Sequence, residues 1–223
     1  MNQESMRHRV SIQVSDKLRT PSKNHGFPFT EAGDLMAYRL PTAAAMQMTS
    51  DEFLVWESGD DLRYELIDGQ VVVMESASEG HQIVTANILV ELRQHVRGTG
   101  CRALPGLDVR CDDANCLVPD VLVYCDKDRR SRGMVDCPLL VEVLSPSTAY
   151  KDRNIKFARY RGLAALREYM IVDWKRRTTD LHRLAADGSW QVTRYSGKEV
   201  VYLASIDLAL PGEVIFDDLD HAA

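Results

Sequence analysis

The sequence lacks several features, and each absence narrows what the protein can be. It has no run of ~18 consecutive apolar residues, so we expect no transmembrane helix and no membrane partner. The N-terminus lacks the charged, apolar and small-residue order of a secretory signal. The five cysteines are odd in number and form no CxxC pair, so we expect neither a disulfide framework nor a zinc ribbon. These absences favour a reduced, cytoplasmic location with cysteines packed as small apolar side chains.

The sequence also lacks the net positive charge of a non-specific nucleic-acid binder. Its formal charge is −6, and its contents of 45% apolar and 27% charged residues are ordinary for a globular protein. The charge is unevenly distributed, because residues 127–177 carry 13 basic and 6 acidic side chains. This segment is either a solvated helix with its loops or a surface that faces phosphate.

Hydrophobic periodicity is scarce at the N-terminus. Residues 1–47 are rich in polar turn-formers, and we interpret them as a flexible N-terminal arm. Residues 48–220 then predict a single domain. Thr49 and Glu52 have capping-box spacing, which indicates a short helix at its start. Asp68-Gly69 between two apolar runs predicts a β-hairpin, because both residues tolerate the positive φ of a two-residue turn.

Apolar patterns predict the remaining elements. A helix is expected from Ser78 to about Arg97, with an apolar stripe made of Ile83, Ala86, Val90 and Val96. Strands are expected over residues 104–110, 118–125, 139–144, 168–173, 178–184, 190–195 and 199–203, and a helix capped by Asp152 over 153–161. This order predicts an α/β fold with a mixed β-sheet flanked by helices.

Glu142 lies in the middle of an apolar strand that is expected to be covered on both faces. A carboxylate there needs a partner, since desolvating the charge costs several kcal/mol. Asp120 opens the preceding apolar strand, so the two carboxylates converge if the strands are neighbours. At ~4–5 Å and an effective dielectric of ~20 they would repel by roughly 3–4 kcal/mol. A shared proton or a bound cation relieves this repulsion, and oxygen ligands favour Mg²⁺ or Mn²⁺.

An i, i+4, i+8 pattern follows on the next predicted helix. It places Lys156 between Asp152 and Tyr160 on one helical face, so the ammonium can point inward. Beside two carboxylates and a metal, it could orient an attacking water and stabilise charge on a phosphate. The alternative is a structural Asp–Glu–Lys network without chemistry. The basic side chains that would face outward, toward phosphate or solvent, are Lys151, Arg153 and Arg159.

Several motifs succeed one another at family-like spacing. They are Tyr64-Glu65-Leu-Ile-Asp-Gly69, Pro119-Asp120-Val121, Val141-Glu-Val-Leu-Ser-Pro-Ser-Thr148, Asp152-x-x-x-Lys156-x-x-x-Tyr160 and Glu168-Tyr-Met-Ile-Val-Asp173. Together they resemble the Uma-two branch of the PD-(D/E)XK nuclease superfamily over about residues 48–220. The resemblance implies a restriction-endonuclease-like core that acts on DNA with a divalent metal, and a homodimer.

The resemblance also implies roles for individual residues. Asp120 and Glu142 become metal ligands, with the Val143 carbonyl as a third. Glu65 matches an upstream acidic position that often touches the site. His81 occupies a place from which this branch often points a histidine toward the cleft; the alternative is an exposed polar residue in a first helical turn.

One position departs from the common pattern. The lysine usually lies two residues after the glutamate, where this chain has Leu144, and Lys156 on the following helix takes its place. Lys151 is a less favourable substitute because it precedes the expected cap. We therefore predict a metal-dependent endonuclease, with a DNA-binding or structural module lacking turnover as the alternative. Hydrolysis of a small phosphorylated molecule is a weaker third hypothesis, since no Gly-rich phosphate cradle is present.

Overall fold

The computed structural model describes residues 46–125, 137–145 and 149–219. The chain divides into two units, Met1–Tyr38 and Arg39–Ala223, and all described residues belong to the second. The predicted arm, residues 1–47, lies outside the described residues apart from its last two. The first basic residues of the segment 127–177, from Lys127 to Arg132, also lie outside the described residues.

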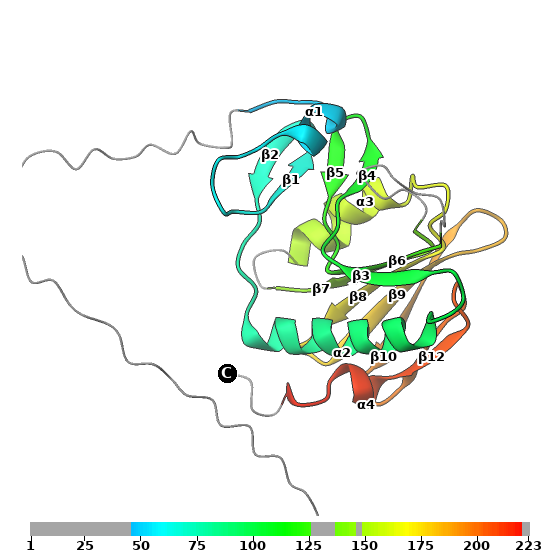
Figure 1. Ribbon diagram of the computed structural model, residues 1–223. Helices are drawn as coiled ribbons and strands as arrows, with labels where there is room; N and C mark the ends of the chain where they lie inside the picture. Colours follow the sequence, from blue (N-terminus) through cyan, green and yellow to red (C-terminus); the bar gives the residue numbers. More distant parts are fainter. Residues whose placement is uncertain (1–45, 126–136, 146–148, 220–223) are drawn as a thin grey trace, which may run out of the picture. The chain divides into compact units, whose positions relative to one another are not determined.

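A six-stranded mixed sheet forms the centre of the second unit, with strand order β10-β9-β8-β7-β6-β3 (Figure 1). β7 and β8 are parallel, whereas the other neighbours are antiparallel. Every residue of β6, β7 and β8 is buried, as expected for strands covered on both faces. The strands are β3 (Arg102–Pro105), β6 (Val121–Tyr124), β7 (Leu139–Val143), β8 (Glu168–Asp173), β9 (Thr178–Leu184) and β10 (Trp190–Ser196).

A smaller, four-stranded sheet has the order β2-β1-β5-β4. Its first two strands form the predicted hairpin, with Asp68 and Gly69 at φ values of 51° and 77°. Helix α1 (Ser50–Val55) precedes it and carries the predicted capping box of Thr49 and Glu52. Both of these local predictions are confirmed. The strands are β1 (Tyr64–Ile67), β2 (Gln70–Val73), β4 (Val109–Asp112) and β5 (Asn115–Leu117).

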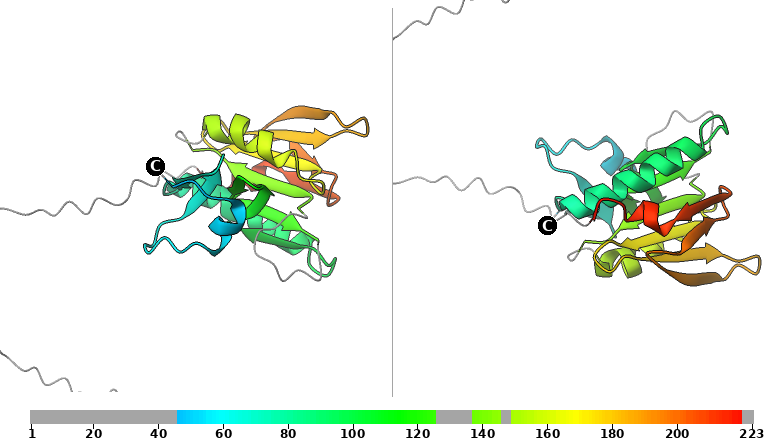
Figure 2. Two further views of the ribbon diagram at one scale, coloured as in Figure 1. Left: turned by 90° about the horizontal axis from the view of Figure 1, so that it is seen from above. Right: turned by 90° about the horizontal axis from the view of Figure 1, so that it is seen from below.

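Helices cover both faces of the six-stranded sheet (Figure 2). One face carries α2 (Glu79–His95), together with the hairpin β11 (Val200–Leu203) and β12 (Leu208–Pro211) and helix α4 (Gly212–Ile215). The other face carries the π-helix η2 (Lys151–Lys156) and α3 (Phe157–Tyr160). Because successive strand residues point to opposite faces, Val141 packs in the first cluster and Leu140 in the second. The α/β prediction with a helix-flanked mixed sheet is confirmed.

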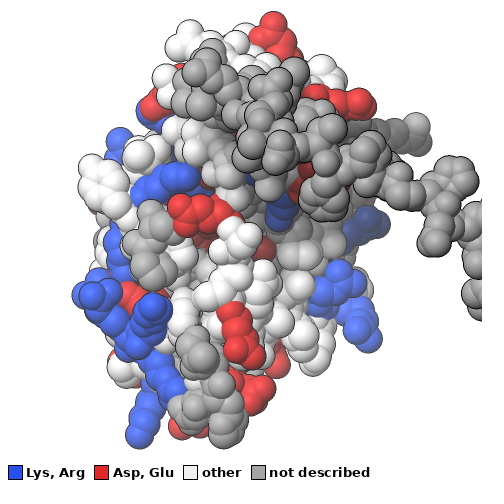
Figure 3. Space-filling model, turned by 90° about the vertical axis from the view of Figure 1, so that its left-hand side faces the viewer, with Lys and Arg blue, Asp and Glu red and all other residues white. Residues whose placement is uncertain are grey.

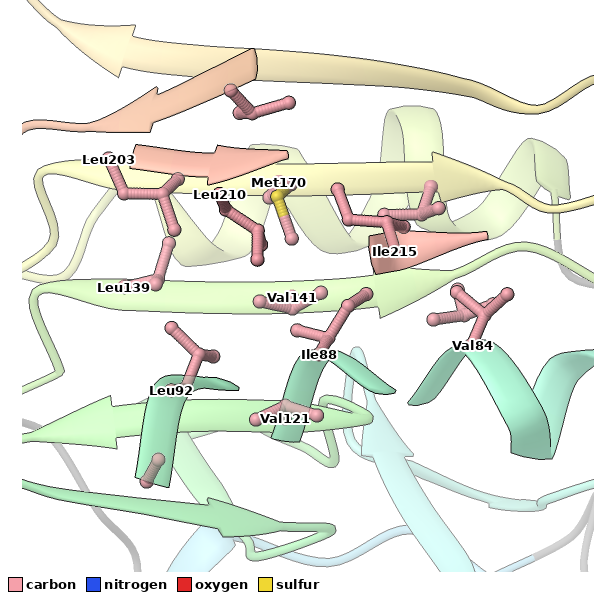
Figure 4. Close-up of a cluster of buried hydrophobic side chains, with 14 of the residues drawn as sticks. Val84, Ile88, Leu92, Val121, Leu139, Val141, Met170, Leu203, Leu210 and Ile215 are labelled. Atoms are coloured by element: carbon pink, nitrogen blue, oxygen red, sulfur yellow. The ribbon is translucent and has the colours of Figure 1, made fainter. Parts of the chain in front are cut away.

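The apolar face of α2 agrees with the predicted stripe only in part: Val96 is buried and Ile83 packs against the same cluster, whereas Ala86 is exposed. Val84, Ile88 and Leu92 are fully buried against the sheet (Figure 4), whereas Val90 is 49% exposed. These three residues follow a strict i, i+4, i+8 spacing, which gives a narrower stripe than the predicted set. This face of α2 is buried because its side chains pack against those of β6 and β7.

Other expectations about elements and cysteines were wrong. Asp152 does not cap a helix; it is buried inside η2, which begins one residue earlier. The strand expected over residues 104–110 is interrupted at Gly106, whose φ is 53°. A disulfide joins Cys101 to Cys125, next to the β3–β6 pair of Arg102 and Tyr124. Register therefore brings together two cysteines that spacing alone did not pair.

Within the described ranges, no helix combines the length and apolar character needed to cross a membrane.

Candidate active site

Neighbouring strands bring two carboxylates together at one end of the six-stranded sheet. β6 and β7 pair with Val121 opposite Val141, so one further step places Asp120 opposite Glu142 on the same face. Asp120 Oδ2 accepts a hydrogen bond from the Val143 amide at 2.7 Å. The expectation that the two strands are neighbours is confirmed.

A third carboxylate reaches the same place from the smaller sheet. Glu65 lies in β1 and is 2% exposed. Its Oε1 accepts a hydrogen bond from the Val118 amide at 3.0 Å, which fixes the side chain on the segment that leads into β6. The site is thus built where the two sheets approach each other.

Lys156 points inward from η2 and binds these carboxylates. Its Nζ lies 2.7 Å from Glu65 Oε1, 3.0 Å from Glu142 Oε1 and 3.6 Å from Asp152 Oδ1. It also lies 3.4 Å from the Val118 carbonyl. The π-helix permits this arrangement because its wider turns place Asp152 and Lys156, four residues apart, toward one buried point.

Tyr160 adds a neutral donor, since its hydroxyl donates a hydrogen bond to Glu142 Oε1 at 3.1 Å. Burial and the nearby carboxylates hold the pKa of Tyr160 well above its usual range, so the hydroxyl keeps its proton. Glu142 Oε1 therefore accepts from both the tyrosine and the lysine. The i, i+4, i+8 face predicted from the sequence is the face that meets Glu142.

The cluster carries more negative than positive charge. Burial raises the pKa of Glu142 well above its usual value, and the carboxylates of Asp152, Asp120 and Glu65 raise it further, against the opposing effect of Lys156. Burial would lower the pKa of Lys156, but the carboxylates of Glu142, Glu65 and Asp152 outweigh burial and raise that pKa, so the ammonium stays protonated. A divalent cation would relieve the remaining repulsion.

His81 contacts the same oxygen of Asp120 as the Val143 amide does. Its Nε2 lies 3.3 Å from Asp120 Oδ2, and the residue is only 8% exposed, so the alternative of an exposed histidine is wrong. Burial lowers the pKa of His81, but the hydrogen bond and charge of Asp120 and the backbone of Val143 outweigh it and raise the pKa. The histidine thus contacts the carboxylate and the main-chain group that the resemblance assigns to metal binding.

The outward basic residues go to different places. Lys151 reaches the cluster, with Nζ 3.8 Å from Glu65 Oε2 and a side chain 25% exposed. Arg153 instead binds Asp180 on β9, and Arg159 binds Asp68 in the hairpin turn. On the face shown in Figure 3, Lys and Arg side chains gather toward the edges with Asp and Glu between them. Of the predicted phosphate contacts, the structure therefore brings His81 and Lys151 to the carboxylates.

The chemistry of the donor set limits what metal the site can hold. Among the described residues, no three His, Cys, Asp or Glu side chains are arranged to hold a metal ion. Asp120 and Glu142 supply two carboxylates, and the Val143 carbonyl is adjacent. Mg²⁺ is commonly held by one or two carboxylates together with water and substrate phosphate, so these residues fit such an ion rather than a dedicated protein cage. The Asp120 side chain is 20% exposed and is therefore open to a hydrated ion.

Sequence reasoning missed the supports of this site. Gly80 lies directly before His81, and a Cβ built on it would lie 2.5 Å from the ring of Trp174. The start of α2 therefore rests on the indole, which sets the position of His81. The main chain of Val118 contacts both Glu65 and Lys156. These contacts could not be predicted from the sequence, because main-chain groups are the same in every residue.

Comparisons with known proteins agree with this architecture. The family model described as "Uma2: Putative restriction endonuclease" matches residues 50–212. An uncharacterized protein of Synechocystis sp. (strain ATCC 27184 / PCC 6803 / Kazusa), slr1290, is 32% identical over 184 residues, which cover 80% of this chain and 96% of that protein. A second uncharacterized protein from the same organism, sll1609, is 27% identical over 158 residues, which cover 68% of this chain and 89% of that protein.

A solved structure shares the fold. It is the crystal structure described as that of "a putative nuclease belonging to DUF820" from Anabaena variabilis ATCC 29413. The match has a TM-score of 0.64 at 16% sequence identity and covers 76% of this chain and 97% of that one. The mixed sheet with flanking helices is therefore common to both chains.

Proposed function

The chain belongs to the Uma2 family, and we propose that it is a metal-dependent endonuclease that hydrolyses phosphodiester bonds in DNA. One observation carries the proposal: Asp120, Glu142 and Lys156 come from three separate elements and gather around one negatively charged point. That point is closed on the Glu142 side and partly open at Asp120 and Lys151. A phosphate could approach from the open side.

Asp120 and Glu142 would hold Mg²⁺ or Mn²⁺, together with the Val143 carbonyl. The bound ion would lower the pKa of a water and neutralise charge on the scissile phosphate. Glu142 would be held in one orientation by Lys156 and Tyr160, which both bond its Oε1. In this proposal His81 orients Asp120.

In this proposal Lys156 and Lys151 together would perform the roles of the single lysine in the common family pattern. Lys156 makes close contacts to Glu65, Glu142 and the Val118 carbonyl, so it would act by fixing the carboxylates. Lys151 is more exposed and lies at the open side of the site, where an ammonium can meet a phosphate oxygen. Glu65 would hold both lysines in place.

Cleavage assays with near-isosteric variants test the proposal. Supercoiled, linear and single-stranded DNA would be incubated with Mg²⁺ or Mn²⁺ and wild type, Asp120→Asn or Glu142→Gln. We expect each variant to lose at least ~10²-fold in rate, since metal binding supplies several kcal/mol of transition-state stabilisation. Glu213→Gln, an exposed acid in α4, is the matched control and should cleave as wild type does. Equal rates in all four proteins would discard the assignment.

A DNA-binding module without turnover is the second candidate, favoured by Leu144. This residue stands where the common pattern has its lysine, and it is buried in the apolar cluster that contains Tyr160 and Tyr169. Titration calorimetry separates the two functions. DNA binding that is tight, is unchanged by metal and by Glu142→Gln, and is not followed by cleavage supports the module.

The proposed homodimer, which would place two sites on a duplex, is tested by sedimentation velocity.

A further inference from the structure

A cavity of about 400 Å³ lies between the C-terminal part of α2 and strand β3. Three arginines, a cysteine of the disulfide and several apolar side chains line it: Arg93, Val96, Arg97, Cys101, Arg102, Ala103 and Leu104. Its volume lies within the range of small-molecule sites, which is about 300–1,000 Å³. The mixture of cationic and apolar lining suits a ligand that has both kinds of surface.

The cavity is separate from the candidate active site. His81 and Arg93 are 12 residues apart on α2, which corresponds to about 18 Å along the helix axis. The β3–β6 pairing shows the same separation, because Pro105 lies opposite Val121 near the active site and Arg102 lies opposite Tyr124 at the far end. A ligand here would not contact the carboxylate cluster.

The arginines of this cavity are not neutralised within the described part of the chain. Arg110 and Arg183, by contrast, bind carboxylates at 2.5–2.7 Å. Arg93 makes only a long hydrogen bond, 3.5 Å from Nη1 to the Ala103 carbonyl. No ion pair of Arg97 or Arg102 is formed among these residues, and no described acidic side chain lines the cavity. All three arginines are exposed, so their guanidinium groups can turn toward an anion bound in the hollow.

We propose that this cavity binds an organic phosphate of nucleotide size. Planar guanidinium groups bind phosphate in bidentate fashion and also stack on flat rings. Leu104 lines the cavity and is partly exposed, so it offers an apolar surface against which a base can lie. The shared chemistry is a phosphate monoester on a nucleoside, supplied by a free mononucleotide or by the 5′-phosphorylated end of a strand. The proposal is independent of the proposed nuclease function.

Titration calorimetry on the full chain tests the site with AMP, inorganic phosphate and adenosine. We expect AMP to bind, inorganic phosphate to bind at least tenfold more weakly, and adenosine not to bind measurably. Arg97→Gln and Arg102→Gln should each weaken AMP binding at least tenfold; Arg93 is left in place because it contacts the β3 backbone. Arg161→Gln, an exposed arginine outside the cavity, should change nothing.

Two further measurements distinguish a free nucleotide from a strand end, and the cavity from the candidate active site. If a 5′-phosphorylated tetranucleotide binds and AMP does not, the ligand is a strand end, and the same arginine variants must weaken its binding. Glu142→Gln should bind AMP as wild type does. The proposal is overturned if neither AMP nor the tetranucleotide binds, if adenosine binds as well as AMP, or if Glu142→Gln abolishes binding while the arginine variants do not.

Discussion

Lys156 contacts three buried carboxylates, those of Glu65, Glu142 and Asp152, and its own side chain is 5% exposed. Replacing it with Met keeps most of the volume but removes the compensating charge. Because breaking a buried ion pair leaves an uncompensated charge, we expect Lys156→Met to lower the free energy of unfolding by ~3–5 kcal/mol at pH 7. Urea denaturation followed by circular dichroism measures this difference.

The control for this substitution is Lys151→Met, which removes a partly exposed ammonium 3.8 Å from Glu65 and should cost under about 1 kcal/mol. The deficit of Lys156→Met should also shrink toward lower pH. Glu142 has a raised pKa in the fold, so its protonation on acidification removes the uncompensated charge. A variant as stable as wild type at pH 7 would show that the lysine does not compensate these carboxylates.

Asp180 gives the molecule an acid-sensitive contact. Burial of this carboxyl acts to raise its pKa, but hydrogen bonds and charge from Arg194 and Arg153 outweigh burial, so the pKa is lowered. A lowered folded-state pKa contributes stability that is present above the unfolded value of ~3.9 and is lost as pH falls through the folded value. Wild type should therefore lose stability below about pH 4.

Asp180→Asn tests this pH dependence. The amide keeps the shape of the side chain but does not titrate, so the acid-induced loss of stability should be shallower in the variant than in wild type. Thermal melts from pH 3 to pH 7 measure both slopes. Asp61→Asn, at an exposed position away from Asp180, serves as the control. Identical pH profiles for wild type and Asp180→Asn would contradict the assigned role.

At the scale of elements, the contact between α2 and Trp174 holds the helix start in place. Gly80→Ala would put a Cβ 2.5 Å from a ring carbon of Trp174, so the helix or the indole must shift. We expect a loss of ~1–3 kcal/mol in the free energy of unfolding, as for other overpacked sites. If the protein cleaves DNA, the displaced His81 should lower its rate as well.

A double substitution separates the loss caused by this contact from a nonspecific loss of stability. Trp174→Leu removes the ring that the new methyl group meets, so adding Gly80→Ala to it should cost less than adding it to wild type. Gln82→Ala, on the exposed side of the same helix, should change stability by no more than ~0.5 kcal/mol. Additive losses from the two core substitutions would contradict the contact.

Elements fixed by short-range chemistry were predictable from the sequence. The capping box of Thr49 and Glu52 and the Asp68-Gly69 turn depend on neighbouring residues only, and both form as predicted. The buried face of α2 was not predictable, because the sheet decides whether Val84 or Val90 is covered. Hairpin β11–β12 and the Cys101–Cys125 disulfide likewise depend on strand register, which composition does not reveal.

The candidate site was predictable in part for the same reason. A carboxylate inside an apolar strand is a local anomaly, and the sequence alone is enough to single out Glu142. Asp120 and Lys156 followed from strand order and helical spacing, and the contact between Lys156 and Glu142 is as expected. The bonds of Asp120 to the Val143 amide and to His81 were not predicted. The ion pairs that draw Arg153 and Arg159 away from the site could not be foreseen, since their partners Asp180 and Asp68 lie far away along the chain.

At the scale of the whole molecule, charge limits how the proposed nuclease can hold DNA. The chain carries a net charge of −6, and several basic side chains among the described residues are already paired: Arg153, Arg159, Arg176 and Arg194 each bind a carboxylate. Affinity from phosphate neutralisation alone should therefore be modest. In this proposal a bound divalent cation supplies part of the attraction that a basic surface supplies elsewhere.

Salt dependence measures this directly. Each neutralised phosphate contributes about −0.9 to the slope of log K against log salt, and because Lys151 is the partly exposed ammonium that the described residues place at the carboxylates, we expect a slope of about −2 to −4. Fluorescence anisotropy of a labelled duplex with the cleavage-deficient Glu142→Gln, from ~50 to ~200 mM salt, gives that slope. Adding Lys151→Ala should make it shallower by about 1, whereas adding Arg161→Ala should not. A slope of about −8 or steeper would mean that DNA lies on an extended basic surface, and an unchanged slope without Lys151 would place the backbone away from the Asp120–Glu142 site.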